Sequence, residues 1–305
     1  MRVLISGSTG FVGNALLGAL LTKGHDVCRL VRPSTRIAAP ASGSTPPVLT
    51  WDPIAGTLDP AANGAEAVIH LAGASIADRR WTAARKQILR DSRIGATRQL
   101  VSALGRLARP PGIFLAASAI GYYGNRGDET LTEASTSGQD FLSSLCQDWE
   151  AESNKARDWS ARVVLLRFGI ILAKHGGALP RMSLPFRLGL GGRLGSGRQW
   201  MSWVSLEDTV GITTHALEMA SLNGPVNVVS PNPVRNADFV ASLGRALHRP
   251  ALFPAPAGVL RLVLGEMADS LLLSSQRVVP QTVSKSSYRF AHQDVTECLR
   301  EIFAG

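Results

Sequence analysis

The chain has 305 residues, of which 45% are apolar and 18% are charged, and its formal net charge is +9. A chain of this length and composition can bury a large core as an ordinary globular protein. The arginines that carry the charge are scattered, with no dense run and no interleaved aromatic residues, so we expect no nucleic-acid partner. We interpret the charge as a field that attracts an anionic cofactor and substrate, although a solvated basic surface is the open alternative.

The cysteines, the histidines and the late apolar stretch exclude further classes. Cys28, Cys146 and Cys298 are odd in number and far apart, which indicates neither a disulfide framework nor a metal site. This pattern fits a reducing compartment, so we expect a cytoplasmic location. The histidines lack metal-ligand spacing. Residues 257–273 are interrupted by three charged residues, so we expect no membrane span and no membrane partner.

The first twenty residues predict a strand, a glycine turn and a helix. The apolar run Val3–Ile5 leads into Gly7-x-x-Gly10-x-x-Gly13, and an apolar-periodic segment follows directly. In this context Gly7 allows the turn, Gly10 removes a side chain that would block phosphates, and Gly13 lets the helix pack on the strand. The positive end of the helix dipole then faces a pyrophosphate, so we predict a dinucleotide site.

The second strand, His25–Val31, indicates which dinucleotide binds. An NAD site usually has Asp or Glu at the end of this strand, to accept a hydrogen bond from the ribose 2′-hydroxyl. This chain has Arg32 there, and its next acid is Asp52. A guanidinium can bind a 2′-phosphate with paired hydrogen bonds, so we predict NADP. The alternative is that Arg32 is only a solvated strand-end residue.

Strands and helices then alternate, which predicts an α/β fold with a doubly wound, Rossmann-type parallel sheet. Further strands are expected at residues 48–51, 67–71, 113–117, 162–168, 201–204 and 226–229, and helices at 82–107, 141–160 and 206–220. The buried stripe of the first of these helices is predicted at Ala84, Ile88, Ala96, Leu100, Leu104 and Leu107. That helix could also pair in a homodimer.

Two domains are predicted from the change of pattern along the chain. Residues 1–229 form the dinucleotide-binding domain, and within it residues 170–200 contribute to a substrate cleft. Residues 230–305 are helical and punctuated by prolines, so we expect a smaller, mostly helical carboxy-terminal lobe.

Five motifs carry a resemblance that spans nearly the whole chain. They are STGFVG at 8–13, HLAG at 70–73, SAIGYYG at 118–124, the segment 184–208 and the segment 265–281. With these motifs the chain resembles the extended short-chain dehydrogenase/reductase superfamily. Within it, the chain is similar to the atypical epimerase family, whose members are NAD-dependent epimerase/dehydratase-like and carry a carboxy-terminal domain of unknown function.

The resemblance implies a Rossmann-type domain that holds NADP, and a lobe that closes over the substrate. The implied cofactor-binding residues are Gly7, Thr9, Gly10, Phe11, Val12, Gly13, Val31, Arg32, Arg36, Leu71, Ala72, Gly73, Arg93, Ser118 and Arg167. Arg93 lies on the partly apolar side of its helix, where an unpaired cation is costly and an anionic ligand would remove the cost. A salt bridge to Asp91 is the alternative. Arg167 ends a buried strand at the ligand edge of the sheet.

The catalytic residues of the superfamily are only partly present. Active members combine a Ser or Thr with Tyr-x-x-x-Lys, in which the tyrosine transfers a proton and the lysine lowers its pKa. Ser118 occupies the place of the serine, but the helix that should carry the pair reads FLSSL at 141–145. Tyr123, or its neighbour Tyr122, is the first candidate proton donor, and packing over the cofactor is the alternative role. A carboxylate on the following loop is the other candidate, at Asp128 or Glu133.

A glycine-rich loop is the candidate substrate site. Its arginines are Arg187, Arg193 and Arg198, and Trp200 follows them. Guanidiniums and an indole suit a phosphate with a stacking ring, as in a nucleotide sugar, although a structural turn with solvated arginines is the alternative. We hypothesise an NADP(H)-dependent oxidoreductase or epimerase that acts on a small phosphorylated or nucleotide-linked substrate. The rival hypothesis is a non-catalytic NADP(H) sensor that gates a protein partner.

Overall fold

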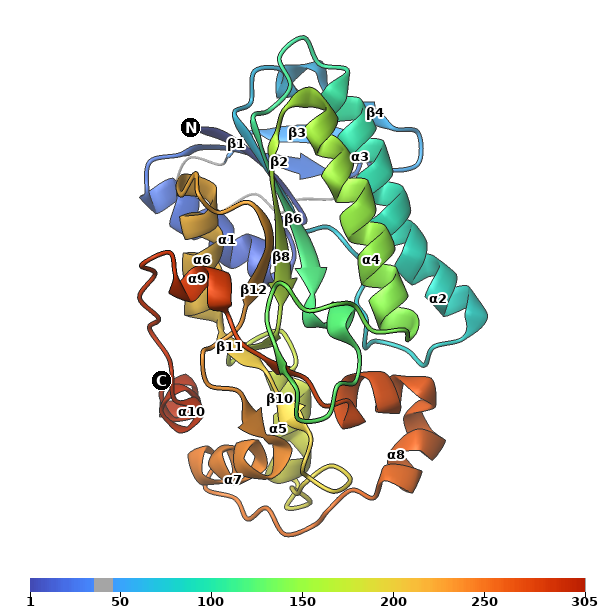
Figure 1. Cartoon of the computed structure of the whole chain (residues 1–305), viewed down its shortest axis with the longest axis vertical. Helices are drawn as coiled ribbons and strands as arrows, with labels where there is room; N and C mark the ends of the chain where they lie inside the picture. The colour runs from blue at the N-terminus through green and yellow to red at the C-terminus, as the bar shows by residue number, and fades with distance from the viewer. Residues whose placement is uncertain (36–45, 305) are drawn as a thin grey trace.

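The computed structural model describes residues 1–35 and 46–304, and a single large sheet forms its centre (Figure 1). Neighbouring strands follow the order β12-β8-β6-β5-β1-β2-β3-β4. Their bounds are β1 Arg2–Ser6, β2 Asp26–Val31, β3 Val48–Asp52, β4 Thr57–Leu58, β5 Ala67–His70, β6 Ile113–Ala119, β8 Arg162–Phe168 and β12 Gly224–Val228. Every neighbouring pair is parallel except β3 with β4. The predicted doubly wound parallel sheet is confirmed.

The strand order reverses between β1 and β5. The chain adds β2 and β3 on one side of β1, then crosses back to place β5 on the other side. At this point Ser6 is paired with Leu30 on one side and with His70 on the other. Open parallel sheets bind ligands outside the carboxyl ends of the strands at such a reversal. The glycine turn follows β1 at this position.

Helices cover both faces of the sheet, α1 and α6 on one side and α3 and α4 on the other (Figure 1). Their bounds are α1 Phe11–Thr22, α2 Ala83–Arg90, α3 Ala96–Gly105, α4 Phe141–Asn154 and α6 Leu206–Glu218. Successive strand residues alternate between the two cores: Ile5 packs with Leu16 of α1, whereas Leu4 packs with Leu100 of α3. Both faces are buried, which explains why the strands are continuous apolar runs.

The helix predicted at 82–107 is present, with a π-helical segment, Asp91–Gly95, between α2 and α3. Its predicted buried stripe is wrong in the first half, because Ala84 and Ile88 are exposed and Leu89 is buried instead. Leu89 belongs to a separate cluster with Trp81 and Leu142 of α4. These neighbours lie outside the sheet cores, so a different side of the helix is covered there.

A lobe with its own core lies below the carboxyl ends of the strands (Figure 1). Its helices are α5 Leu179–Arg187, α7 Asn236–Ala246, α8 Ala257–Leu264 and α10 Val295–Ala304, whereas the short helix α9 Gln281–Ser284 packs on the sheet core that contains α1. Two short strand pairs contribute to its core, β9 Ile170–Leu172 with β11 Trp203–Ser205 and β10 Trp200–Met201 with β13 Val234–Arg235. A third pair, β7 Thr130–Leu131 with β14 Arg277–Val278, belongs to a separate cluster around Tyr123. The lobe core includes Phe186 and Trp203 as well as Phe239 and Leu299, so residues on both sides of position 229 build it.

Candidate functional site

The turn between β1 and α1 is closely packed because of two glycines. Gly7 has a φ of +73°, and a Cβ at this position would lie 2.8 Å from the carbonyl carbon of Leu71. A Cβ on Gly13 would lie 2.2 Å from the carbonyl oxygen of Gly7. The two glycines therefore allow the turn to approach the loop after β5, and allow α1 to approach the turn.

The amino end of α1 is left open for an anion. Its N-cap, Gly10, provides no side-chain hydrogen bond, and the first turn of the helix has no acidic residue. The backbone N–H groups of the first helical turn have no partner within the helix, and they carry the positive end of its dipole. A Cβ on Gly10 would meet only the Gly7 carbonyl oxygen within 4 Å. These residues fit a pyrophosphate.

Arg32 follows the end of β2, the strand that pairs with β1 just before this turn. Val31 is buried, and Arg32 follows it with an exposed side chain. The Arg32 carbonyl accepts a hydrogen bond of 2.8 Å from the Thr35 N–H, which folds the chain back after the strand. Arg36 lies outside the described residues, so the structure does not test its predicted role.

Arg93 lies in the π-helical segment, on the other side of the loop after β5. Its Nη2 donates to the Ala74 carbonyl at 2.9 Å, and its guanidinium carbon lies 5.3 Å from the centre of the Trp149 ring. Nη1 is buried and has no hydrogen-bond partner. Burial lowers the pKa of Arg93. The alternative ion pair of Arg93 with Asp91 is not formed, and the Asp91 carboxylate accepts from Gln87.

An unpaired buried guanidinium N–H is costly and needs an explanation. A Cβ on Gly73 would lie 3.4 Å from the Arg93 guanidinium carbon, so Arg93 is next to the loop that faces the glycine turn. A hydrogen-bond acceptor of a bound dinucleotide would satisfy Nη1. π-Helical segments are frequent at functional sites, which agrees with this placement.

A buried polar network joins β6, β8 and α4. Both carboxylate oxygens of Glu150 accept from Arg167, from Nε at 2.8 Å and from Nη2 at 2.8 Å. The Ser118 hydroxyl donates to the same carboxylate at 2.6 Å. Arg167 Nη1 donates to the Tyr123 hydroxyl at 2.9 Å, and that hydroxyl donates to Asn227 at 2.7 Å.

This network uses polar groups that the sequence analysis assigned to catalysis and cofactor binding. The hydroxyl protons of Ser118 and Tyr123 are donated to protein acceptors, and the charge of Arg167 is balanced by Glu150. Burial raises the pKa of Tyr123 to about 12, which disfavours proton release. The geometry therefore supports structural roles for these three side chains, and their predicted catalytic and cofactor roles remain predictions.

Comparison with known proteins places this arrangement in a family. The model of the NAD-dependent epimerase/dehydratase family matches residues 3–229, and the model of a domain of unknown function matches residues 255–302. The chain belongs to the NAD-dependent epimerase/dehydratase family. The predicted resemblance is thereby confirmed, and so is its carboxy-terminal domain of unknown function.

Individual relatives of this epimerase-family chain cover 97% or more of its length. "Epimerase family protein Mb2239" of Mycobacterium bovis is 43% identical over 298 residues, which are 97% of this chain and 96% of the relative. The crystal structure of the human epimerase family protein SDR39U1 with NADPH is 35% identical, has a TM-score of 0.87, and covers 100% of this chain and 99% of its own. A structure described as a nucleoside-diphosphate sugar epimerase of Corynebacterium glutamicum is 33% identical with a TM-score of 0.78, and the match covers 100% of this chain and 58% of that one. The human structure contains NADPH, the coenzyme that Arg32 predicts for this family member.

Sequence reasoning missed Glu150, the centre of the buried network in this epimerase-family chain. A usable signal was present, because Leu142, Cys146, Trp149 and Glu150 follow helical spacing and all lie on the buried side of α4. A carboxylate on that side requires a cation. Its partner, Arg167, could not be identified from spacing, since it lies on another element.

The substrate prediction is only partly reproduced by the structure. Arg187, Arg193 and Arg198 are exposed. Trp200 is half-buried and lies between two other arginines, with the guanidinium carbon of Arg235 at 4.1 Å and that of Arg277 at 4.6 Å from its ring centre.

Asp128 closes one side of this cluster. It accepts from Trp200 Nε1 at 3.0 Å and from Arg235 Nη1 at 2.8 Å. The hydrogen bond from Arg235 is the main reason that the pKa of Asp128 is lowered. Arg277 has no ion pair with a described carboxylate, so its charge is available on the face of the indole.

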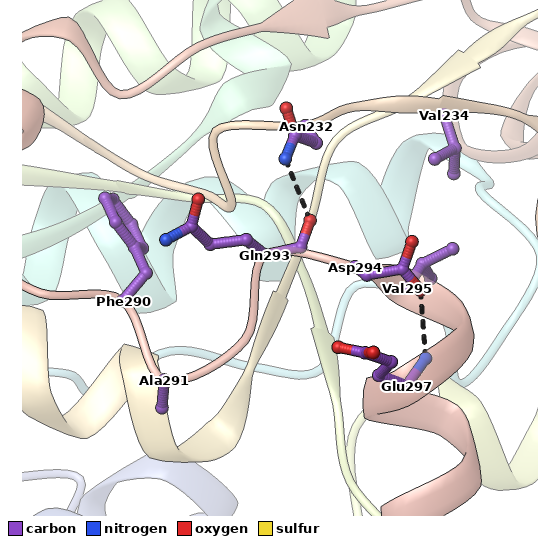
Figure 2. A pocket seen from close by; sticks show the side chains of 8 residues that line it. All are labelled: Asn232, Val234, Phe290, Ala291, Gln293, Asp294, Val295 and Glu297. Atoms are coloured by element: carbon purple, nitrogen blue, oxygen red, sulfur yellow. Dashed lines mark hydrogen bonds between the residues drawn. The ribbon is translucent and has the colours of Figure 1, made fainter.

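The other feature of this epimerase-family structure is a shallow pocket at the start of α10 (Figure 2). It is lined by Asn232, Val234, Phe290, Ala291, Gln293, Asp294, Val295 and Glu297. Within it Asn232 donates to the Gln293 carbonyl at 3.0 Å. None of the lining residues comes from the glycine turn, β2 or β6, so this pocket is separate from the candidate dinucleotide site.

The described residues contain neither a metal-binding group of side chains nor a membrane-spanning helix. In the portions 1–35 and 46–304, His, Cys, Asp and Glu nowhere form a group of three that could hold a metal ion. None of the helices in these portions has the length and apolar character needed to cross a membrane.

Proposed function

We propose that the chain binds NADP(H) and acts as an oxidoreductase or epimerase on a small phosphorylated or nucleotide-linked hydroxyl or carbonyl compound. One observation carries this proposal: the open amino end of α1 faces the loop after β5, and next to that loop Arg93 has a buried guanidinium N–H without a partner. A pyrophosphate fits the first feature, and a hydrogen-bond acceptor of the same ligand would satisfy the second. The NADPH in the human relative supports the choice of ligand.

Residues of the chain would hold the dinucleotide in three places. The N–H groups of the first turn of α1 would bind the pyrophosphate, Arg32 would bind the 2′-phosphate, and Arg93 would donate to an acceptor across the turn. When bound, the nicotinamide would supply hydride transfer, and the chain itself must supply binding, orientation and a proton.

Tyr122 is the proton donor that the geometry favours, in place of Tyr123. No hydrogen bond is formed by its hydroxyl with a described residue, and its ring centre lies 3.5 Å from the guanidinium carbon of Arg167. The stacked guanidinium holds the Tyr122 ring in place, so its hydroxyl stays available to a substrate. Tyr123, by contrast, is fully buried and its hydroxyl is bonded on both sides.

Trp200 and Arg277 are the proposed substrate subsite. An indole face with a free guanidinium can stack a ring and bind a phosphate. The description of the Corynebacterium glutamicum relative as a nucleoside-diphosphate sugar epimerase supports a substrate of this chemistry. We therefore propose a nucleotide sugar as the substrate class.

A non-catalytic sensor that gates a protein partner is the second candidate function. It is favoured by α4, which carries neither a tyrosine nor a lysine between Phe141 and Asn154. It is also favoured by the internal hydrogen bonds of Ser118 and Tyr123. In this case the dinucleotide would bind without turnover.

The test combines a turnover assay with a binding assay. The purified chain is given NADP⁺ or NADPH with a panel of nucleoside-diphosphate sugars, and both the absorbance of the reduced coenzyme and the sugar products are followed. We expect turnover of at least one sugar, and Tyr122→Phe should reduce it by roughly a hundredfold or more while NADPH binding is unchanged. Tyr123→Phe is the matched control and should keep most of the turnover.

The outcomes separate the two candidate functions. NADPH binding with no redox change and no new sugar product would contradict the enzyme and favour the sensor. A pull-down from cell extract with and without NADPH would then identify a partner that depends on the coenzyme. Loss of turnover in Tyr123→Phe and not in Tyr122→Phe would contradict the assignment of the proton donor.

A further inference from the structure

Arg29 is an arginine inside strand β2 that the sequence analysis did not consider. It is paired with Ile5 of β1 and with Val48 of β3. Ile5 and Val27 both pack in the core that contains α1, so the alternation of the strand places the Arg29 side chain on that face. A strand position on this face is otherwise apolar, which makes a cation here unusual.

The Arg29 side chain reaches from β2 to the glycine turn. Its Nε donates to the Ser8 hydroxyl at 3.1 Å, and Ser8 is 1% exposed. A guanidinium has five N–H donors, and this contact uses one of them. No described carboxylate pairs with Arg29, although the surface of the molecule is rich in such pairs. The Arg29 side chain is half-buried, so part of it is accessible to a ligand.

This guanidinium lies between the two places that a dinucleotide's adenosine half would occupy. The pyrophosphate would lie on the turn that contains Ser8, and the ribose 2′-position would lie at the end of β2, next to Arg32. A 2′-phosphate at that position could be bound by two guanidiniums. Arg32 would reach it from the residue that follows β2, and Arg29 would reach it from a position inside β2. Two guanidiniums without carboxylate partners match a dianion, whereas an unsubstituted ribose needs neither.

We propose that Arg29 is a second determinant of NADP over NAD, which binds the 2′-phosphate together with Arg32. This inference rests on the proposed NADP(H) binding and deepens it. The competing role is purely structural: Arg29 would hold the glycine turn through Ser8. That role would affect both coenzymes equally, since the turn would serve the pyrophosphate that NADPH and NADH share.

The test is calorimetric titration of NADPH and NADH into the full chain and its variants. Arg29→Met keeps the length of the side chain and removes the charge, and we expect the Kd for NADPH to rise about tenfold or more. The Kd for NADH should change less than about twofold. Arg29→Lys keeps the charge and should retain part of the preference for NADPH. Ser8→Ala removes the acceptor of the Nε bond but leaves the guanidinium, so its preference for NADPH should survive.

Each result decides between the roles. Equal losses for both coenzymes in Arg29→Met, reproduced by Ser8→Ala, would overturn the proposal in favour of the structural role. Unchanged NADPH affinity in Arg29→Met would also overturn it while leaving the proposed function intact. If the unmodified chain binds neither coenzyme, the proposed function itself fails and the inference fails with it. Thermal unfolding of each variant verifies that it is folded.

Discussion

Charged side chains in the interior of this protein fall into two kinds. In one kind the protein provides partners for the hydrogen-bonding groups, and in the other a hydrogen-bonding group has no partner. Arg167 and Glu150 are both nearly fully buried and satisfy each other through two hydrogen bonds. Arg93 forms a hydrogen bond through Nη2, whereas its buried Nη1 has no hydrogen-bond partner. A satisfied pair supports structure, and an unsatisfied group indicates a ligand, so we assign stability to the first and binding to the second.

Removal of the Glu150 charge should destabilise the fold. Glu150→Gln leaves the buried Arg167 guanidinium without a counter-charge, and we expect a loss of about 3 kcal/mol or more in the free energy of unfolding, measured with urea. The double variant Glu150→Gln, Arg167→Met removes both charges and should recover at least half of that loss. A single variant within about 0.5 kcal/mol of the unmodified chain would show that the pair is not a stabilising element.

At the scale of the element, helix α1 carries two glycines with opposite requirements. Gly13 faces the turn, where a Cβ would overlap the Gly7 carbonyl, whereas Gly18 is exposed and a Cβ there would meet nothing within 4 Å. The same residue type is thus required by packing at one position and only tolerated at the other.

Alanine substitutions at Gly13 and Gly18 together test whether the close packing of the turn is needed for NADPH binding. Gly18→Ala should raise the free energy of unfolding by roughly 0.5–1 kcal/mol, because alanine favours the helix, and it should leave NADPH binding unchanged. Gly13→Ala must displace the turn or the helix, and we expect NADPH affinity to fall at least about tenfold in a chain that still folds. NADPH binding of Gly13→Ala at the unmodified affinity would contradict the role of the turn.

At the scale of the whole molecule, one buried histidine links folding to pH. Both ring nitrogens of His70 are hydrogen-bonded inside the fold, Nδ1 with Ser6 at 2.6 Å and Nε2 with Thr97 at 3.0 Å. Burial lowers the pKa of His70 from 6.5 to about 4. Between these values the unfolded chain binds a proton that the folded chain does not, so stability falls as the pH decreases through this window.

The expected size of the His70 effect is about 3 kcal/mol between pH 7 and pH 4. Urea unfolding of the unmodified chain and of His70→Gln over this range would measure it. The glutamine can keep hydrogen bonds to the same neighbours and does not titrate, so its stability should fall less steeply on acidification. Parallel pH profiles for the two proteins would contradict the assignment to His70.

The sequence predicts the secondary structure and the parallel sheet of the molecule better than its buried polar contacts. Strand bounds, the parallel sheet and the glycine turn follow from local apolar runs and glycine spacing, and β8 agrees with the prediction at both ends. The partners of Arg167 and Trp200 depend on how distant segments meet. Glu150 reaches Arg167 from α4, and Arg277 reaches Trp200 from a strand 77 positions later in the numbering. The exposed Ile88 was mispredicted for the same reason, since its helix changes neighbours along its length.

We infer that the turn between β1 and α1 binds a dinucleotide whose 2′-phosphate is selected by Arg32 at the end of β2. Calorimetric titration of NADPH and NADH into the unmodified chain and into Arg32→Glu tests it most directly. The unmodified chain should bind NADPH at least about tenfold more tightly than NADH, and Arg32→Glu should lose this preference while it keeps binding NADH. Absence of heat with either coenzyme, or equal losses for both in Arg32→Glu, would contradict the claim.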